Sequence, residues 1–205
     1  MNMARGVPVV VSAPSGAGKT TLCRKVMGQL GKIEFSISYT TRPARGHEVD
    51  GKDYHFITRE SFDEKIEAGD FLEWADVHGK RYGTGRAATE KWLSKGHDVF
   101  FDIDYQGGFQ IRDALPDAVL VFIVPPSLDV LESRLRGRQT DSEEQILKRL
   151  AKAREEIAQA KDYDYWICND NLDEASELLE SILKAERNRR LSKSAAVEAW
   201  LSKAK

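Results

Sequence analysis

Residues 13–20, with the sequence APSGAGKT, have the composition and order of a loop that binds phosphate groups. Gly16 and Gly18 permit backbone conformations and a close approach that a Cβ atom would block. Successive backbone N–H groups in such a loop point at anionic oxygens, and the positive end of the following helix faces the same oxygens. Lys19 can reach the β- and γ-phosphates, and the Thr20 hydroxyl can ligate magnesium. The loop therefore predicts a site for a nucleoside triphosphate with its Mg²⁺ ion.

The segments on either side of this loop support the interpretation. Residues 9–11 are three valines, which is typical of a buried strand, and a helix-forming stretch follows the loop. Ala13 stands where the strict pattern has glycine, so an ordinary glycine-rich turn is the alternative. We expect nine residues to bind the nucleotide: Ala13, Pro14, Ser15, Gly16, Ala17, Gly18, Lys19, Thr20 and Thr21.

A second set of residues suited to phosphate lies in segment 35–56, FSISYTTRPARGHEVDGKDYHF. Arg42 and Arg45 are three residues apart around a proline. Two guanidinium groups on one loop suit a doubly charged phosphate, because planar donors match its oxygens in pairs. Tyr54 and Tyr82 could each add a phenolic hydrogen bond. These residues alone leave open a solvated, arginine-rich loop.

Four segments that follow the phosphate-binding loop in a fixed order resemble those of guanylate kinases, over nearly the whole chain. They are residues 35–56, FLEWA at 71–75, RYGT at 81–84 and DIDYQG at 102–107. The first is the most distinctive, although His47 replaces a glycine that is usual in the family. The resemblance implies transfer of the γ-phosphate of ATP to GMP, giving ADP and GDP, with Mg²⁺ as cofactor. How well dGMP replaces GMP is left open.

The resemblance also implies two groups of residues around GMP. The phosphate would be held by Arg42, Arg45, Tyr54 and Tyr82, and the guanine would be faced by Ser38, Glu73, Thr84 and Asp104. The chemistry agrees, because a carboxylate suits the N1–H and N2–H donors of guanine and a hydroxyl from Ser38 or Thr84 suits its O6 acceptor. Adenine would leave such buried groups unpaired. Without the resemblance, Glu73 would be interpreted as a surface carboxylate beside Trp74.

Three arginines near residue 140 match the arginines of the family's lid, which stabilise the phosphoryl group during transfer. They are Arg134, Arg138 and Arg149; a solvated helix face is the alternative. Gln139 replaces a usual glycine, which leaves the shape of the lid loop in doubt. The residues expected to act in catalysis are Lys19, Arg42, Arg134, Arg138 and Arg149.

Two more residues have a predicted role at the ATP side of the site. Asp102 ends an apolar run, and an acid in that place commonly supports the magnesium shell of P-loop enzymes, here through water. Asn169 follows a short strand, and the resemblance places an asparagine there near the ATP base. Helix or turn capping is the alternative for both residues.

Composition bounds the remaining classes of function. The chain has 205 residues and a net charge of −2, so no overall basic field favours nucleic acid. We find no run of 18 apolar residues, and near the start no apolar stretch of the length typical of a signal peptide, so we expect neither a signal peptide nor a membrane partner. Cys23 and Cys168 are far apart in sequence, which argues against a disulfide framework and fits the cytoplasm. The sequence leaves open whether the chain forms a homo-oligomer.

Alternating strands and helices predict an α/β fold with a parallel sheet and helices on both faces. Together with the P-loop, the family resemblance implies a P-loop NTPase-type core, a small mixed α/β insert that binds the nucleoside monophosphate and a helical lid. We expect the core at 1–37, 86–126 and 156–205, the insert at 38–85 and the lid at 127–155. Strands are predicted at 9–11, 35–39, 71–77, 99–103, 119–124 and 165–168, and a turn at 80–85. Helices are predicted after the P-loop, at 61–68, at 89–95, after Ser127, after Ser142, at 172–191 and at 195–201.

Three alternatives to this function stay open. A similar P-loop kinase could act on another phosphorylated small molecule, and a screen of acceptors would decide. A protein-binding module related to guanylate kinases usually lacks an intact P-loop, whereas Lys19 and Thr20 are present here. A nucleic-acid-dependent ATPase is disfavoured because no basic and aromatic groove for single strands is evident.

Overall fold

The computed structural model describes residues 5–137, 142–192 and 201–202. Five strands form a parallel central sheet in the order β2-β7-β1-β8-β9, which confirms the predicted fold class. The strands are β1 (Pro8–Ser12), β2 (Ile33–Phe35), β7 (Asp98–Asp102), β8 (Val119–Val124) and β9 (Tyr165–Cys168).

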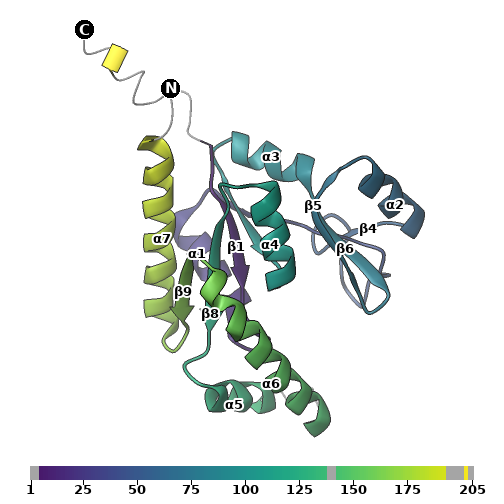
Figure 1. Cartoon of the computed structure of the whole chain (residues 1–205), viewed down its shortest axis with the longest axis vertical. Helices are drawn as coiled ribbons and strands as arrows, with labels where there is room; N and C mark the ends of the chain where they lie inside the picture. The colour runs from purple at the N-terminus through teal and green to yellow at the C-terminus, as the bar shows by residue number, and fades with distance from the viewer. Residues whose placement is uncertain (1–4, 138–141, 193–200, 203–205) are drawn as a thin grey trace.

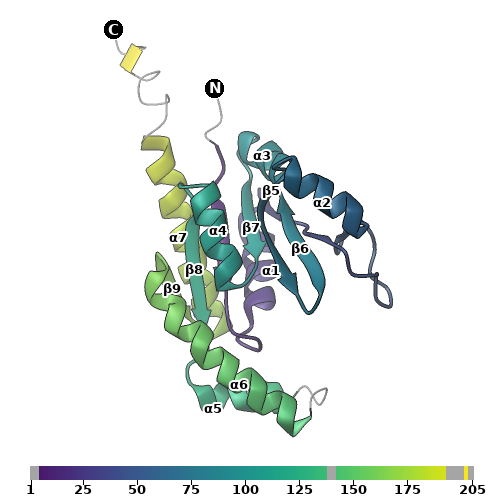
Figure 2. The ribbon, with the colours of Figure 1, turned by 45° about the vertical axis from the view of Figure 1, so that its right-hand side comes forward.

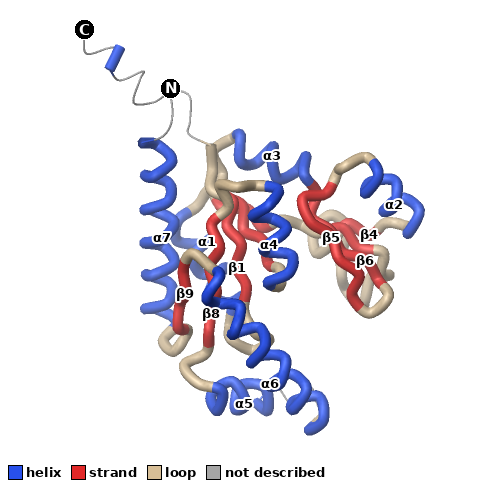
Figure 3. Tube along the Cα trace, in the orientation of Figure 1, coloured by secondary structure: helices blue, strands red, loops and turns tan. Residues whose placement is uncertain are grey.

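Helices cover both faces of this sheet (Figures 1, 2 and 3). Because side chains alternate along a strand, Val9 and Val11 face α1 (Lys19–Leu30) and α7 (Leu172–Ser192). Val10 faces the other side, with α3 (Arg86–Ser94) and α4 (Tyr105–Ala114). Burial of each large apolar side chain contributes about 1.5–3 kcal/mol, so the two layers fix the sheet edge that carries the P-loop. None of the described helices is long and apolar enough to cross a bilayer.

A second, smaller sheet lies beside the core, at the right of Figure 1. Its order is β4 (His55–Phe56), β3 (Tyr39–Thr40), β6 (Lys80–Gly85) and β5 (Phe71–Val77). The helix α2 (Arg59–Glu67) covers it through Phe62, whose ring stacks on Phe71 at 4.5 Å. The Trp74 N–H donates to Gln110 Oε1 at 3.3 Å, which joins β5 to α4 of the core.

Two helices extend from the edge of the main sheet where its strands end (Figure 2). They are α5 (Leu128–Gly137) and α6 (Glu143–Ala158), and the short 3₁₀ helix η1 (Gln159–Asp162) leads from α6 to β9. Leu131, Leu135, Ile146 and Ala153 form an apolar cluster between α5 and α6. The helices predicted after Ser127 and after Ser142 are confirmed, and these residues cap them: Ser127 Oγ accepts from Val130 N, and Ser142 forms a capping box with Gln145.

Several local predictions are wrong in detail. Residues 80–85 form strand β6, not a turn, because the backbone turns at His78 and Gly79, both with positive φ, and pairs β6 with β5. The run 35–39 is divided between the two sheets and is not one strand. Helix α2 begins at Arg59 with Thr58 as its cap, two residues before the predicted start at 61. Helix α4 has no counterpart in the prediction, and most of the predicted helix 195–201 lies outside the described residues.

A buried ion pair holds α7 against the start of β7. Asp98 is 1% exposed, accepts from Val7 N at 2.9 Å and pairs with Arg187 Nε at 2.8 Å. We expect Arg187→Ala to lower the free energy of unfolding by about 2–3 kcal/mol, because it removes the counter-charge of a buried carboxylate. Urea titration followed by circular dichroism measures this. Lys184→Ala, which removes an exposed pair with Glu180 on the same helix, should cost about 0.5 kcal/mol or less, and equal losses would contradict the argument.

Candidate functional site

The P-loop lies at the point where the strand order of the main sheet reverses. β1 has β7 on one side and β8 on the other, and its register places Val11 beside Asp102. In parallel α/β sheets, ligands bind outside the carboxyl ends of strands at such a position. Residues 13–18 therefore leave β1 directly into the ligand-binding edge, between the ends of β7 and β8.

Two glycines of the loop are required by its geometry. Gly16 and Gly18 have φ of 97° and 91°, a region that residues with a Cβ rarely adopt. A Cβ on Gly18 would also lie 2.4 Å from Asn169 Nδ2, which itself donates to the Ala17 carbonyl at 2.7 Å. No side chain caps α1 at Gly18, so the first N–H groups of this helix face the loop without a capping side chain. This is the arrangement of an anion site.

Lys19, Thr20 and Asp102 meet at the start of α1. The Lys19 ammonium group pairs with Asp102, and Thr20 Oγ1 donates to Asp102 Oδ2 at 3.5 Å. Lys19, which is expected to reach phosphate, thus lies in one cluster with Thr20 and Asp102, which are expected to support a metal ion. Asp102 does not cap a helix here, because α4 is capped by Asp104.

The predicted phosphate ligands of the insert form a second cluster. Arg42, which is 7% exposed, donates from Nε to the Tyr82 hydroxyl at 3.2 Å. Its guanidinium lies 5.1 Å from the centre of the Tyr54 ring, and the rings of Tyr54 and Tyr82 are 6.0 Å apart. Arg45 is exposed, and its backbone N–H donates to Glu48 at 2.7 Å.

Three of the four predicted guanine ligands lie on β5, on β6 and at the start of α4, and the fourth, Ser38, directly precedes β3. Glu73 is 6% exposed, and the fully buried Thr84 donates its hydroxyl to Glu73 Oε1 at 2.6 Å. Asp104 accepts from Gly107 N at 3.1 Å, and a Cβ on Gly107 would lie 3.3 Å from Glu73 Oε2. Burial raises the pKa of the Glu73 carboxyl, the Thr84 hydrogen bond opposes this shift, and the charge of Asp104 adds to it. The pair Glu73–Thr84 is therefore a preformed acceptor, not a surface carboxylate.

Two of the predicted lid arginines reach the P-loop region. Arg149 donates from Nη1 to Ser15 Oγ at 3.4 Å, and Arg134 donates from Nη2 to the Asn169 carbonyl at 3.0 Å. Asn169 is buried, and its side chain supports the P-loop carbonyl of Ala17 and does not cap a helix. The predicted site residue Arg138 and the neighbouring Gln139 lie outside the described residues.

A cavity of about 390 Å³ lies between the P-loop edge of the core and the insert. Thr20 and Asp102 line it from the core, and Ser38 and Tyr54 line it from the insert. Sequence reasoning missed several other residues that line this cavity, namely Arg24, Phe35, Ser36, Ile37, Glu48, Lys52 and Asp53. The sequence did point to Glu48, because it lies in the GHEVDG part of the distinctive segment 35–56. Nothing in the sequence pointed to Arg24 except its position one helical turn after Thr20.

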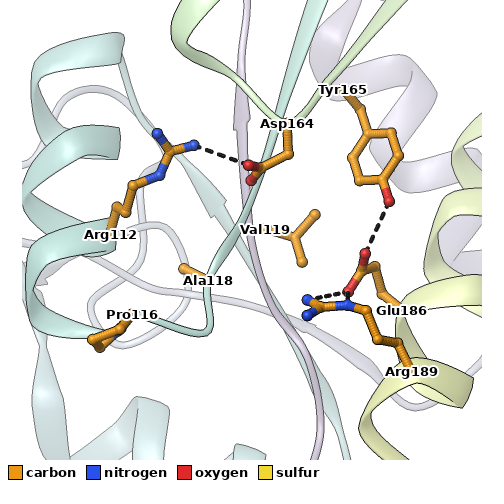
Figure 4. Close-up of a pocket in the computed structure, with 8 residues that line it drawn as sticks. All are labelled: Arg112, Pro116, Ala118, Val119, Asp164, Tyr165, Glu186 and Arg189. Atoms are coloured by element: carbon orange, nitrogen blue, oxygen red, sulfur yellow. Dashed lines mark hydrogen bonds and ion pairs between the residues drawn. The ribbon is translucent and has the colours of Figure 1, made fainter.

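A larger hollow, of about 650 Å³, lies at the opposite edge of the sheet, where β8 and β9 begin (Figure 4). Its charged side chains pair with each other. Arg112 faces Asp164 at 3.3 Å, and Glu186 accepts from Tyr165 at 2.9 Å and from Arg189 at 2.6 Å. Because these charged groups pair with one another and none belongs to the clusters above, we place the functional site at the P-loop edge.

Comparison with known proteins agrees with this site. A family model described as guanylate kinase matches residues 5–186. The chain belongs to the guanylate kinase family. The guanylate kinase of Chromobacterium violaceum is 49% identical over 189 residues, which cover 92% of this chain and 90% of that protein. The guanylate kinase of Rhodopseudomonas palustris is 51% identical over 187 residues, with 91% and 85% covered.

A solved structure extends the agreement to the fold of the guanylate kinase family. The crystal structure of guanylate kinase from Anaplasma phagocytophilum matches with a TM-score of 0.71 and 34% identity, and it covers 91% of this chain and 89% of that one. The resemblance found from segments 35–56, 71–75, 81–84 and 102–107 is thereby confirmed.

Proposed function

We propose that this guanylate kinase family member transfers the γ-phosphate of ATP to GMP, giving ADP and GDP. The observation that carries the proposal is the buried carboxylate of Glu73, fixed by Thr84 in the insert, in a chain whose P-loop keeps Lys19 and Thr20. A P-loop alone indicates a nucleoside triphosphate, whereas a desolvated acceptor that faces two adjacent N–H donors favours guanine over adenine.

ATP is assigned to the P-loop edge. The N–H groups of the loop and the start of α1 would hold the β- and γ-phosphates, and Lys19 would leave Asp102 to contact them. Asn169, near the ATP base in the family, here fixes the loop through Ala17. The residues proposed to bind ATP are Ala13, Pro14, Ser15, Gly16, Ala17, Gly18, Lys19, Thr20, Thr21 and Asn169.

Mg²⁺ fits the residues at this place. Thr20 Oγ1 and Asp102 Oδ2 lie 3.5 Å apart, and both are hard oxygen donors of the kind that Mg²⁺ prefers. We propose that Thr20 holds the ion directly and that Asp102 holds it through water. When bound, the ion neutralises charge on the β- and γ-phosphates.

GMP is assigned to the insert. Arg42, Arg45, Tyr54 and Tyr82 would bind its phosphate, a proposal supported by Tyr54, which lines the cavity, and by Arg42, which contacts Tyr82 and lies over the Tyr54 ring. Glu73 and Asp104 would accept from the guanine N–H groups. The Thr84 proton is directed at Glu73, so Thr84 orients this carboxylate and Ser38 is left as the hydroxyl for O6.

The reaction needs no covalent enzyme intermediate. A phosphate oxygen of GMP, already ionised at neutral pH, attacks the γ-phosphorus, so no strong general base is required. Charge spreads over the equatorial oxygens in the transition state, where Lys19, Arg42, Arg134, Arg138 and Arg149 would stabilise it. We propose that the insert (38–85) and the lid (127–155) close on the core (1–37, 86–126 and 156–205), which aligns both substrates and excludes water.

A coupled assay of ADP formation tests the proposal. The protein is incubated with ATP, Mg²⁺ and each of GMP, AMP, CMP and UMP. We expect rapid ADP formation with GMP alone. ADP formation with a different acceptor, or none from folded protein that still binds ATP, would contradict the proposed function.

A further inference from the structure

Glu48 makes the most extensive set of contacts to the proposed phosphate ligands. Its two carboxylate oxygens accept from Arg42 Nη1 and Nη2 at 2.7 and 2.9 Å. Oε2 also accepts from the backbone N–H of Arg45 at 2.7 Å. One carboxylate therefore bonds to both arginines that are proposed to bind the acceptor phosphate.

The hydrogen bonds of Arg42 leave only part of its guanidinium for a ligand. Of five N–H donors, the two on Nη1 go to the Pro43 carbonyl and Glu48, one on Nη2 goes to Glu48, and Nε–H goes to the Tyr82 hydroxyl. The remaining N–H, on Nη2, lies on the edge shared with Nε and is the donor available to the neighbouring Tyr54 hydroxyl, with which Arg42 also interacts, or to a phosphate. Because the Tyr82 oxygen accepts from Nε–H, its own proton is directed elsewhere. The Tyr82 hydroxyl and the second Nη2 N–H therefore belong to the same edge of the guanidinium.

From this geometry we infer that Glu48 is a positioning residue for the acceptor phosphate. By holding the Nη1–Nη2 edge of Arg42, it directs the Nε–Nη2 edge and the Tyr82 hydroxyl toward the phosphate of GMP. The inference rests on the proposed function for the identity of the ligand. It assigns to Glu48 an indirect role, through Arg42 and the backbone of Arg45, and no contact with GMP.

Burial and charge explain why a carboxylate is needed there. The Arg42 side chain is 7% exposed and lies over the rings of Tyr54 and Phe56, so its charge requires a fixed partner. The Arg42 hydrogen bonds, followed by that from the Arg45 backbone, lower the pKa of Glu48 to about 2. Glu48 therefore stays ionised throughout any practical assay range, and the ion pair does not depend on bound substrate.

The opposite role would be competition, in which Glu48 occupies the position of the phosphate and must be displaced. The two roles predict changes of opposite sign in the affinity for GMP when Glu48 is replaced. Removing a competitor raises the affinity for GMP, whereas removing a positioning residue lowers it.

The test is Glu48→Gln, with binding of GMP and of guanosine measured by calorimetry. The glutamine NH₂ group faces a guanidinium donor, so one of two charge-assisted bonds is lost. We expect GMP affinity to fall about tenfold or more, and guanosine affinity to change by less than about twofold. In steady-state assays, KM for GMP should rise by a similar factor, while KM for ATP changes little. Glu64→Gln, an exposed carboxylate of α2, is the matched control and should change neither ligand's affinity.

Each alternative outcome is distinguishable. Unchanged or higher GMP affinity would overturn the inference, as would equal losses for GMP and guanosine, which would show that Glu48 only maintains the fold of the insert. Glu48→Asp keeps the charge and should recover part of the GMP affinity; it also serves if the glutamine variant does not fold. Failure of the wild-type protein to phosphorylate GMP would reject the proposed function on its own, whereas the ratio of GMP to guanosine affinity tests Glu48 separately.

Discussion

Replacing Lys19 with alanine is expected to lower kcat for GMP phosphorylation by about a hundred- to a thousandfold, while the protein stays folded. Lys19 is the P-loop cation that can stabilise the negative charge on the γ-phosphate in the transition state. Its pair with Asp102 shows that the side chain already lies beside the two oxygen donors assigned to Mg²⁺. The measurement is kcat with saturating ATP and GMP.

Stability is the control for this variant. The Lys19 side chain is 18% exposed and that of Asp102 is 36% exposed, and ion pairs near the surface contribute about 0–1 kcal/mol. For a chain of this size, Tm should therefore fall by less than about 4 °C. Lys91→Ala, an exposed lysine on α3, should leave kcat unchanged. A folded Lys19→Ala protein with near-normal kcat would remove Lys19 from the mechanism.

Most of the central sheet could be predicted from sequence because β1, β7 and β8 are buried on both faces over almost their whole length. Residues 119–124 and 165–168 are apolar or aromatic runs with turn signals at their ends, and the structure places β8 and β9 at the same limits. The P-loop was recognisable for a related reason. Its backbone conformation demands glycine and its chemistry demands Lys19 and Thr20, so the constraint is local in sequence.

The insert was harder to predict because its strands are short and are formed by pairing across the chain. Segment 80–85, KRYGTG, has two glycines and no apolar alternation, yet it becomes β6 because β5 and β3 pair with it on both sides. Helix α4 contains two consecutive glycines, Gly107 and Gly108, which lower helix propensity. Both are buried, and a Cβ on Gly108 would lie 3.0 Å from Val10, so close packing on β1 determines the residue type there.

The functional site was likewise predictable only in part: the residue types could be predicted, but their contacts could not. The types of Arg42, Glu73 and Tyr82 could be matched to a phosphate and a base from sequence, with the family resemblance to connect them. Which group bonds to which could not be predicted. That Thr84 donates to Glu73, and that Glu48 holds one edge of Arg42, follows from the register of β5 with β6 and from the fold of the loop after β3.

Replacing Glu73 with glutamine is expected to lower kcat/KM for GMP by about ten- to a hundredfold. The neutral amide loses the charge that strengthens hydrogen bonds from guanine N1–H and N2–H, and its NH₂ group opposes those donors. KM for ATP should change little, because Glu73 belongs to the insert and not to the P-loop. The ratio of kcat/KM for GMP to that for AMP, measured in the coupled assay, should fall at least about tenfold.

The pH dependence of KM gives an independent test of Glu73. Burial raises its pKa, so its proton binds at a higher pH than it would on an exposed carboxylate. As pH falls into this range, Glu73 becomes neutral and KM for GMP should rise in the wild-type protein. The phosphate of GMP also titrates, but it does so equally for Glu73→Gln, so the difference between the two profiles isolates the carboxylate. The Glu64→Gln control should follow the wild-type profile.

The two readouts for Glu73 separate recognition from folding. A variant that had lost the structure of the insert would bind GMP and AMP equally poorly at every pH, whereas loss of one acceptor changes their ratio and removes one titration. An unchanged preference for GMP over AMP, together with a wild-type pH profile, would contradict the contact and move guanine recognition to Ser38 and Asp104. Thr84→Val offers a further check: it keeps the shape beside Glu73 but removes the 2.6 Å hydrogen bond, so it should raise the pKa of Glu73 and shift the same profile to higher pH.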